Sequence, residues 1–332
     1  MHLQLFLYAA AISAILRLQA TNVASANVLL PTQNVTSTSY RSIRPPDPPG
    51  FQVRIYQPKP EPINLLHPLR VFQSVLFYYY QRGQRRGWTQ PAELEIYKVG
   101  PARMAISIEP LKHEDPSVPV LSISHVMLAL YAGVAHMCET RSFYGTRIDI
   151  SIFGKPIGVI WILGLGQYVH DETIANQTAQ SIPSTNIQDD LLNAIGDDVP
   201  DSGVYADSHV PGMELGYSFS PRKAKSEDIF TCLMEAFLIL VYEGEVNFSH
   251  LDVISAALPP RLALNIHHTA RYVPSNSVIG GLLWLIARFY ATKQRFDEVD
   301  FDMMIKVSGR PPLNRAAGFF MRLDGDAGVA TA

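Results

Sequence analysis

Two six-residue segments, RMAISI at residues 103–108 and RLALNI at residues 261–266, are identical at three positions and similar in type at the other three. At the same spacing upstream, residues 71–76 match residues 229–234. Further matches follow downstream, with small insertions, and end in Gly-Lys-Pro and Gly-Arg-Pro turns. Because the matching blocks occur in the same order, the sequence indicates a tandem duplication.

Within each copy, segments whose apolar residues recur at every second position, as in a strand, alternate with segments whose apolar residues recur at helical spacing. In the first copy we expect strands and helices, in chain order, at residues 51–56, 69–79, 104–108, 121–138, 148–152 and 159–163. In the second copy we expect them at residues 213–219, then in a helix with Ser226 as its N-cap, and then at residues 262–266, 278–292, 301–307 and 319–323. Pro68 is suited to the first position of the first helix.

The sequence therefore predicts an α+β fold: a β-α-β-α-β-β unit used twice, with the helices packed on one face of a mostly antiparallel sheet. We assign the copies to residues 51–163 and 213–323. Between them, residues 164–212 form an acidic linker, and this length without an apolar period predicts flexibility. Residues 27–50, rich in Ser, Thr and Pro, are expected to be disordered, and residues 324–332 form a small polar tail.

Residues 117–138 contain no Asp, Glu, Lys or Arg, which leaves a membrane helix and a buried helix as alternatives. The stretch includes Pro119, His125 and His136, and its counterpart in the second copy carries Arg288. Polar and charged residues of this kind are expensive in a bilayer. We therefore expect a buried helix and no transmembrane span in the mature chain.

Residues 1–26 are typical of a secretory signal peptide. Residues 3–16 are almost continuously apolar, and Ala24-Ser25-Ala26 supplies a small-x-small cleavage pattern. The alternative is an N-terminal membrane anchor, but this apolar run is short for a span of about 20 residues. We expect the chain to be cleaved and secreted to the extracellular space.

Three Asn-x-Ser/Thr sequons agree with secretion and predict N-glycans at Asn34, Asn176 and Asn247. In an oxidising compartment the two cysteines, Cys138 and Cys232, could form a disulfide. The alternative is a pair of buried thiols, since cysteine without a disulfide is among the most buried residue types. The sequence leaves this choice open.

Aromatic-centred helices, Leu130-Tyr131 and Leu283-Trp284, each precede an Arg-Phe element, at residues 141–143 and 295–296, and then a strand and hairpin. This order resembles a group of secreted proteins of filamentous fungi, a group without an established activity. The resemblance spans most of the mature chain. It implies a fungal extracellular setting and supplies no catalytic residue.

Composition and motifs exclude several classes of function. Since 27 Lys and Arg stand against 30 Asp and Glu, we expect no nucleic-acid partner. A hydrophobic content of 47% is too high for a disordered protein. Two cysteines are too few for a disulfide-dense miniprotein or a four-cysteine zinc site. The sequence has no Gly-x-Ser-x-Gly, His-Glu-x-x-His or phosphate-loop motif, and we expect no metal and no cofactor.

Asp149 and Asp302 occupy equivalent positions on the polar face of the third predicted strand. If the copies faced each other, such carboxylates could act as an acid–base pair. The simpler interpretation is that the outward face of a strand carries polar residues.

We carry three hypotheses and leave open whether the chain is an enzyme. The first is a non-catalytic binding or interaction protein for an extracellular ligand or protein, which uses the groove between the copies or the polar faces of the sheets. Those faces carry Gln52, Arg54, Ser107, Asp149, Glu214, Ser218, Asn265 and Asp302. The second is an extracellular hydrolase with carboxylates between the copies. The third is a structural wall protein, although the sequence lacks low-complexity repeats.

Overall fold

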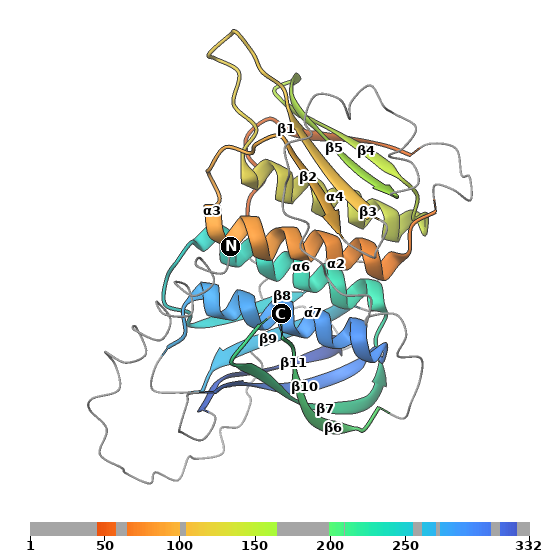
Figure 1. The fold of residues 1–332 in the computed structure, drawn as a ribbon, viewed down its shortest axis with the longest axis vertical. Coiled ribbons are helices and arrows are strands. Elements are labelled where there is room, and N and C mark those ends of the chain that lie inside the picture. The colour runs from red at the N-terminus through yellow and green to blue at the C-terminus, as the bar shows by residue number, and fades with distance from the viewer. Residues whose placement is uncertain are drawn as a thin grey trace, which may run out of the picture. The chain divides into compact units, whose positions relative to one another are not determined.

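Two antiparallel sheets lie on either side of four long helices in the described part of the chain (Figure 1). The computed structural model describes residues 45–57, 65–99, 104–164, 199–208, 210–254, 261–269, 273–306 and 313–323. All of them belong to one compact unit, Tyr40–Ala332. The predicted signal peptide, Asn34, Asn176 and most of the predicted linker lie outside the described residues.

The first half of this unit supplies one sheet and two helices. In chain order its elements are β1 (Phe51–Tyr56), α2 (Pro68–Tyr78), β2 (Glu95–Val99), β3 (Met104–Pro110), α4 (Ile123–Thr140), β4 (Thr146–Ile152) and β5 (Lys155–Gly164). Helix α2 continues through a π-helical turn (Tyr79–Gly83) into the short α3 (Gln84–Arg86). The strands are ordered β1-β4-β5-β3-β2, and every pairing is antiparallel.

The second half repeats this arrangement. Its elements are β6 (Ser202–Ala206), β7 (Met213–Lys223), α6 (Ser226–Glu243), β8 (His250–Ile254), β9 (Arg261–His268), α7 (Asn276–Lys293), β10 (Asp297–Ile305) and β11 (Leu313–Leu323). The strand order is β6-β7-β10-β11-β9-β8. Apart from the added edge strand β6, the two sheets have the same order, and the predicted α+β duplication is confirmed.

The structure contains three strands that the sequence prediction did not include. β2 and β8 follow the first helix of each half, and β6 lies inside the range predicted as linker. All three are edge strands of five residues that pair with one neighbour, β3, β9 and β7 respectively. Each has only five residues, which is too few for the apolar pattern to distinguish it from a loop.

The predicted start of the first helix is correct in the first half and shifted in the second half. Pro68 is the first residue of α2, as predicted. Ser226, predicted as the N-cap of α6, is instead the first helical residue, and Lys225 takes the N-cap position. The Ser226 hydroxyl donates to the Glu227 carboxylate at 3.0 Å rather than capping the backbone. Glu227 and Asp228 lie in the first turn, where the helix dipole favours negative charge.

The uncharged stretch forms α4 and is buried between the two halves. One side of α4 contacts β1, β4 and β5, and the other contacts α2 and α6. Among the described residues, no helix combines the length and the apolarity needed to cross a bilayer.

The helices of the two halves meet across a pseudo-twofold axis. Phe72 of α2 and Phe230 of α6, which are equivalent residues, stack with their ring centroids 5.0 Å apart and their planes 8° from parallel. On either side of this pair, α4 packs on α6 and α7 packs on α2. The contact is therefore of the isologous kind, in which each half presents the same surface to the other.

At Gly318, strand β11 passes so close to Asn265 of β9 and to Phe301 that no side chain fits there. A Cβ at Gly318 would overlap the carbonyl oxygen of Asn265 and lie 2.8 Å from the Phe301 ring. We predict that Gly318→Ala lowers the free energy of unfolding by about 1–3 kcal/mol, measured by urea denaturation, because the backbone of β9 must move. Gly216→Ala is the control. Its Cβ would lie 3.3 Å from the flexible end of Met304, so a comparable loss there would contradict this explanation.

Candidate functional site: a groove between α4 and α6

Helices α4 and α6 run antiparallel, and a buried polar contact joins them. The Tyr131 hydroxyl of α4 donates a hydrogen bond to the Glu235 carboxyl of α6. Tyr131 is 6% exposed and Glu235 only 1%. At the other end of the contact, the charges of Glu227 and Asp228 act on Cys138. The first turn of α6 therefore lies opposite the last turn of α4.

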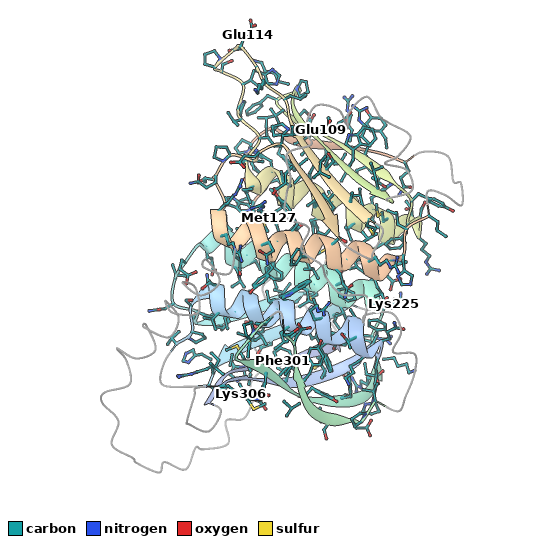
Figure 2. All side chains as sticks on the ribbon, viewed as in Figure 1. Glu109, Glu114, Met127, Lys225, Phe301 and Lys306 are labelled. Atoms are coloured by element: carbon teal, nitrogen blue, oxygen red, sulfur yellow. The ribbon has the colours of Figure 1, made fainter. Side chains whose placement is uncertain are left out.

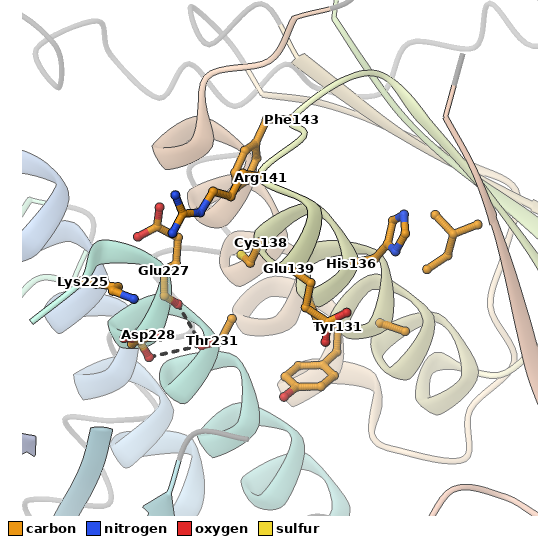
Figure 3. Close-up of a pocket in the computed structure, with 13 residues that line it drawn as sticks. Tyr131, His136, Cys138, Glu139, Arg141, Phe143, Lys225, Glu227, Asp228 and Thr231 are labelled. Atoms are coloured by element: carbon orange, nitrogen blue, oxygen red, sulfur yellow. Dashed lines mark hydrogen bonds between the residues drawn. The ribbon is translucent and has the colours of Figure 1, made fainter. Parts of the chain in front are cut away.

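Small side chains between these two ends leave a groove of about 700 Å³ (Figure 3). On α4, Tyr131, Ala135 and Cys138 share one face by helical spacing, and on α6 Asp228 and Thr231 share the face of Glu235. The space between the helices is not filled, because the side chains of Ala135, Cys138 and Thr231 are small. The lining is completed by Ile55, Ala132, His136, Glu139, Arg141, Phe143, Lys225 and Glu227. Figure 2 places Lys225 at one end of the helical layer.

Charged side chains stand around an apolar wall. Glu139, Arg141 and Lys225 are exposed. Figure 3 shows the side chains of Arg141 and Glu227 pointing toward one another, and His136 on the side of α4 away from α6. The carboxylates of Glu139, Glu227 and Asp228 outnumber the two cations, so the lining carries a small negative excess.

Burial shifts the pKa of two titratable groups in the groove, and the nearby carboxylates add to the shift at Cys138. Burial raises the pKa of the Cys138 thiol to about 12, and the charges of Glu227, Asp228 and Glu139 add to the increase. Burial also raises the pKa of Asp228, with Glu227 acting in the same direction and the cations Lys225 and Arg322 opposing. Cys138 is therefore a protonated thiol at neutral pH.

The pseudo-symmetric contact between α2 and α7 has different residues at the equivalent positions. Where the first contact has Tyr131 and Glu235, the second has Trp284 and Phe77, whose ring centroids are 5.4 Å apart. The place of Ala135 is taken by Arg288, which pairs at 2.8 Å with Asp207. Arg70 stands where α6 has Asp228. The space and the negative charge thus belong to the α4–α6 contact and are not a general property of the repeated unit.

The structure does not bring Asp149 and Asp302 together, so they do not form the acid–base pair of the hydrolase alternative, and their positions agree with the simpler interpretation of a polar outer strand face. Asp149 alternates along β4 with Ile148 and Ile150, which are buried against the helices, and Asp302 alternates along β10 with Phe301 and Met303. Both carboxylates therefore point away from the helical layer, on separate sheets. Asp149 accepts a 2.6 Å hydrogen bond from Arg147, as expected for a solvated sheet face.

The other predicted polar-face residues are divided between the same two outer faces. Arg54 lies beside Asp149 in the β1–β4 register, and Ser218 lies beside Asp300 in the β7–β10 register. Ser107, expected to be accessible, is only 3% exposed, and its register partners are the large residues Ile96 and Trp161. Gln52 is exposed, Glu214 pairs with Lys306, and Asn265 donates to Asp252.

The structure favours the thiol alternative for the cysteines, since Cys138 and Cys232 form no disulfide. Cys232 is fully buried and contacts the carbonyl oxygen of Val253. Asn247 and Ser249 of the third sequon are exposed. Within the described residues, no three His, Cys, Asp or Glu side chains are grouped so that they could hold a metal ion.

Sequence reasoning missed the residues that form the groove. Neither Asp228 nor Glu235 was among the predicted site residues, although Glu235, a carboxyl in the middle of an apolar helix, is itself a signal. Glu235 interrupts residues 229–241, which are otherwise almost all apolar. Its buried position could have been suspected, but its partner on α4 depends on how the two halves pack.

Comparisons with known proteins assign no family. The chain matches no protein-family model and no curated protein. Among solved structures, a conserved protein of unknown function with hot dog fold from Alicyclobacillus acidocaldarius aligns over 82% of this chain and 93% of its own, with 11% identity and a TM-score of 0.14. The tesB protein of Mycobacterium avium subspecies paratuberculosis aligns over the same shares with 8% identity and a TM-score of 0.12. A putative thioesterase from Novosphingobium aromaticivorans covers 67% of this chain and 72% of its own, with 10% identity and a TM-score of 0.11. At these TM-scores neither fold nor function is transferred.

We predict that Tyr131→Phe lowers the free energy of unfolding by about 1–3 kcal/mol, because it removes a donor from a carboxyl that burial has already withdrawn from water. Urea denaturation measures the change. Tyr242→Phe is the matched control, since Tyr242 lies on α6 and is 50% exposed. Equal effects of the two substitutions would show that the Tyr131–Glu235 contact does not hold the helices together.

Proposed function

We propose that the chain is a secreted, non-catalytic binding protein that takes a small extracellular ligand in the α4–α6 groove. The groove itself supports this proposal. Its volume of about 700 Å³ falls in the usual range of small-molecule sites, roughly 300–1,000 Å³. It also joins an apolar wall to a few charged groups, and both halves of the duplication contribute to it.

The chemistry of the groove favours binding over catalysis. The raised pKa of Cys138 keeps its thiol protonated and therefore a poor nucleophile. The Thr231 hydroxyl donates to the backbone carbonyls of Glu227 and Asp228 rather than to a base. The Tyr131–Glu235 pair is almost completely enclosed. The carboxylates of the hydrolase alternative, Asp149 and Asp302, lie outside the groove.

The proposal of an extracellular, fungal-type setting comes from the chain's signal-like beginning, its sequons and its resemblance to fungal secreted proteins. The exposed Asn247 and Ser249 support it, because a glycan there would meet solvent rather than the core.

Blocking the groove tests the binding function. We predict that the full chain retains one or more small molecules after incubation with a soluble metabolite extract and gel filtration, as detected by mass spectrometry of the denatured protein. Ala135→Phe should abolish this retention, because the larger side chain occupies the space between the helices.

The matched control is Ala317→Phe, on the outer face of the second sheet. If Ala135→Phe retained the same compounds as the unsubstituted chain, or if nothing were retained by either, the proposed function would be rejected.

Expression of the full chain in a filamentous fungus tests the location. We predict that the protein accumulates in the medium, that it begins at Asn27, and that an N-glycosidase lowers its mass. Asn247→Gln should remove part of that mass difference. An intracellular protein that keeps residues 1–26 would contradict secretion.

A further inference from the structure

We infer that the α4–α6 groove binds an organic cation, a protonated amine carried on an apolar body, with the carboxylate of Asp228 as its counter-ion. The inference rests on the proposed binding function and names the class of ligand.

Asp228 is a carboxylate held out of solvent at the wall of the groove. The residue is 7% exposed and shares the α4-facing side of α6 with Thr231 and Glu235. Among the described residues, its side chain accepts no hydrogen bond and lies in no ion pair. Buried carboxylates are rarely left so, because burial without a partner is costly. A cationic ligand would supply the missing partner.

The groove is electrically negative at Cys138, across from Asp228. Glu227 and Glu139 line the same groove, and burial raises the pKa of Cys138, with the charges of Glu227, Asp228 and Glu139 adding to the increase. A positive group that lies between Cys138 and Asp228 therefore meets three carboxylates. A positive ligand is attracted there, and a negative one is repelled.

The cations of the lining do not neutralise this site. Arg141 points toward Glu227 rather than Asp228 (Figure 3). Lys225 is exposed, and although its charge is the largest that acts on the pKa of Asp228, burial outweighs it and that pKa is still raised. The N-terminus of α6 would otherwise suit an anion, but Glu227 and Asp228 already occupy its first turn.

The apolar part of the lining fits the body of such a ligand. Tyr131, Ala135 and Phe143 line the same groove as Asp228, and the first and last of these are aromatic. An ammonium group that meets both a carboxylate and aromatic rings gains from both contacts. Ala135 is the position that opens the space.

The duplication supplies an internal comparison. In the α2–α7 contact, Arg288 fills the place of Ala135 with its own guanidinium, which pairs with Asp207. At that contact, a cation of the chain itself meets a carboxylate. In the α4–α6 contact, Ala135 stands in place of Arg288 and Asp228 in place of Arg70, so this contact has space and a carboxylate where the other has two arginines.

Burial outweighs the favourable helix dipole at Asp228, so its charge does not stabilise the fold at neutral pH. A carboxyl whose pKa is raised by folding stabilises the protein below its unfolded pKa, and that contribution is lost as the pH rises through the folded pKa. At neutral pH, a charged Asp228 is therefore destabilising, and Asp228→Asn should leave the melting temperature unchanged or raise it. This variant is thus expected to fold and is suitable for a binding experiment.

The experiment compares three ligands of one shape, phenethylammonium, 2-phenylethanol and 3-phenylpropionate, by NMR titration of the full chain at neutral pH. We expect the ammonium compound to bind about tenfold or more tightly than the alcohol, and the carboxylate to bind most weakly. Asp228→Asn should reduce the preference for the ammonium compound over the alcohol to about twofold or less.

Two variants and a pH series sharpen the result. Asp300→Asn, which removes an exposed carboxylate on the second sheet, should preserve the preference. Ala135→Arg should abolish binding of the amine, because it copies the cation of the other contact. As the pH falls below neutral, protonation of Asp228 should weaken binding of the amine and leave binding of the alcohol unchanged. The charged or titratable groups that surround Asp228 are Lys225, Glu227, Arg322, Cys138, Glu139 and Arg141.

The inference is overturned if the alcohol or the carboxylate binds as tightly as the amine, or if Asp228→Asn keeps the preference for the amine. Those outcomes leave the proposed function intact, provided that Ala135→Phe still blocks retention of the extract compounds. If no probe binds and the extract compounds are also not retained, both the inference and the proposed function fail.

Discussion

The packing of the four helices between the two sheets is the constraint on which the rest of the structure depends. Helix α4 is uncharged until Glu139 and buried on nearly every side, and α7 is buried to a similar extent. One sheet can cover only one side of such a helix, so each half on its own would expose an apolar helical surface to water. The halves therefore bury that surface against each other, and the Phe72–Phe230 stack marks the centre of their contact.

A duplicated unit that packs on itself produces two equivalent contacts, and these have diverged. The α2–α7 contact has an aromatic pair, Phe77 and Trp284, at the position where the α4–α6 contact has Tyr131 and Glu235. An apolar pair is easier to bury, because a buried carboxyl needs hydrogen-bond donors. The polar solution on one side indicates that this contact has been shaped by more than stability. The adjacent groove, lined by small residues and by Asp228, is consistent with that view.

The sequence predicted the local features of this protein and missed those that depend on its assembly. The repeated segments, the helix period and the charge-free stretch of α4 each reflect a short range of sequence, and they led to the correct fold class. The edge strands β2, β6 and β8 were not predicted, because each has only five residues and pairs with a single neighbour. The groove depends on residues of α4 and α6 that are about a hundred positions apart, as in the Tyr131–Glu235 contact. No periodicity within one helix reports such a pairing.

Carboxylates at equivalent positions of a repeat suggest a shared site, but equivalence in the repeat does not by itself indicate a catalytic role. Asp149 and Asp302 recur because the third strand of each half has an outer face, and a solvated face tolerates charge without any requirement for function. Asp228 has no carboxylate counterpart, since the first half has Arg70 at that position. It is also withdrawn from water at the mouth of a groove, where a charge has an energetic cost that must be balanced. In a duplicated protein, the position at which the copies differ and the charge is buried is therefore more informative than the position at which they agree and the charge is solvated.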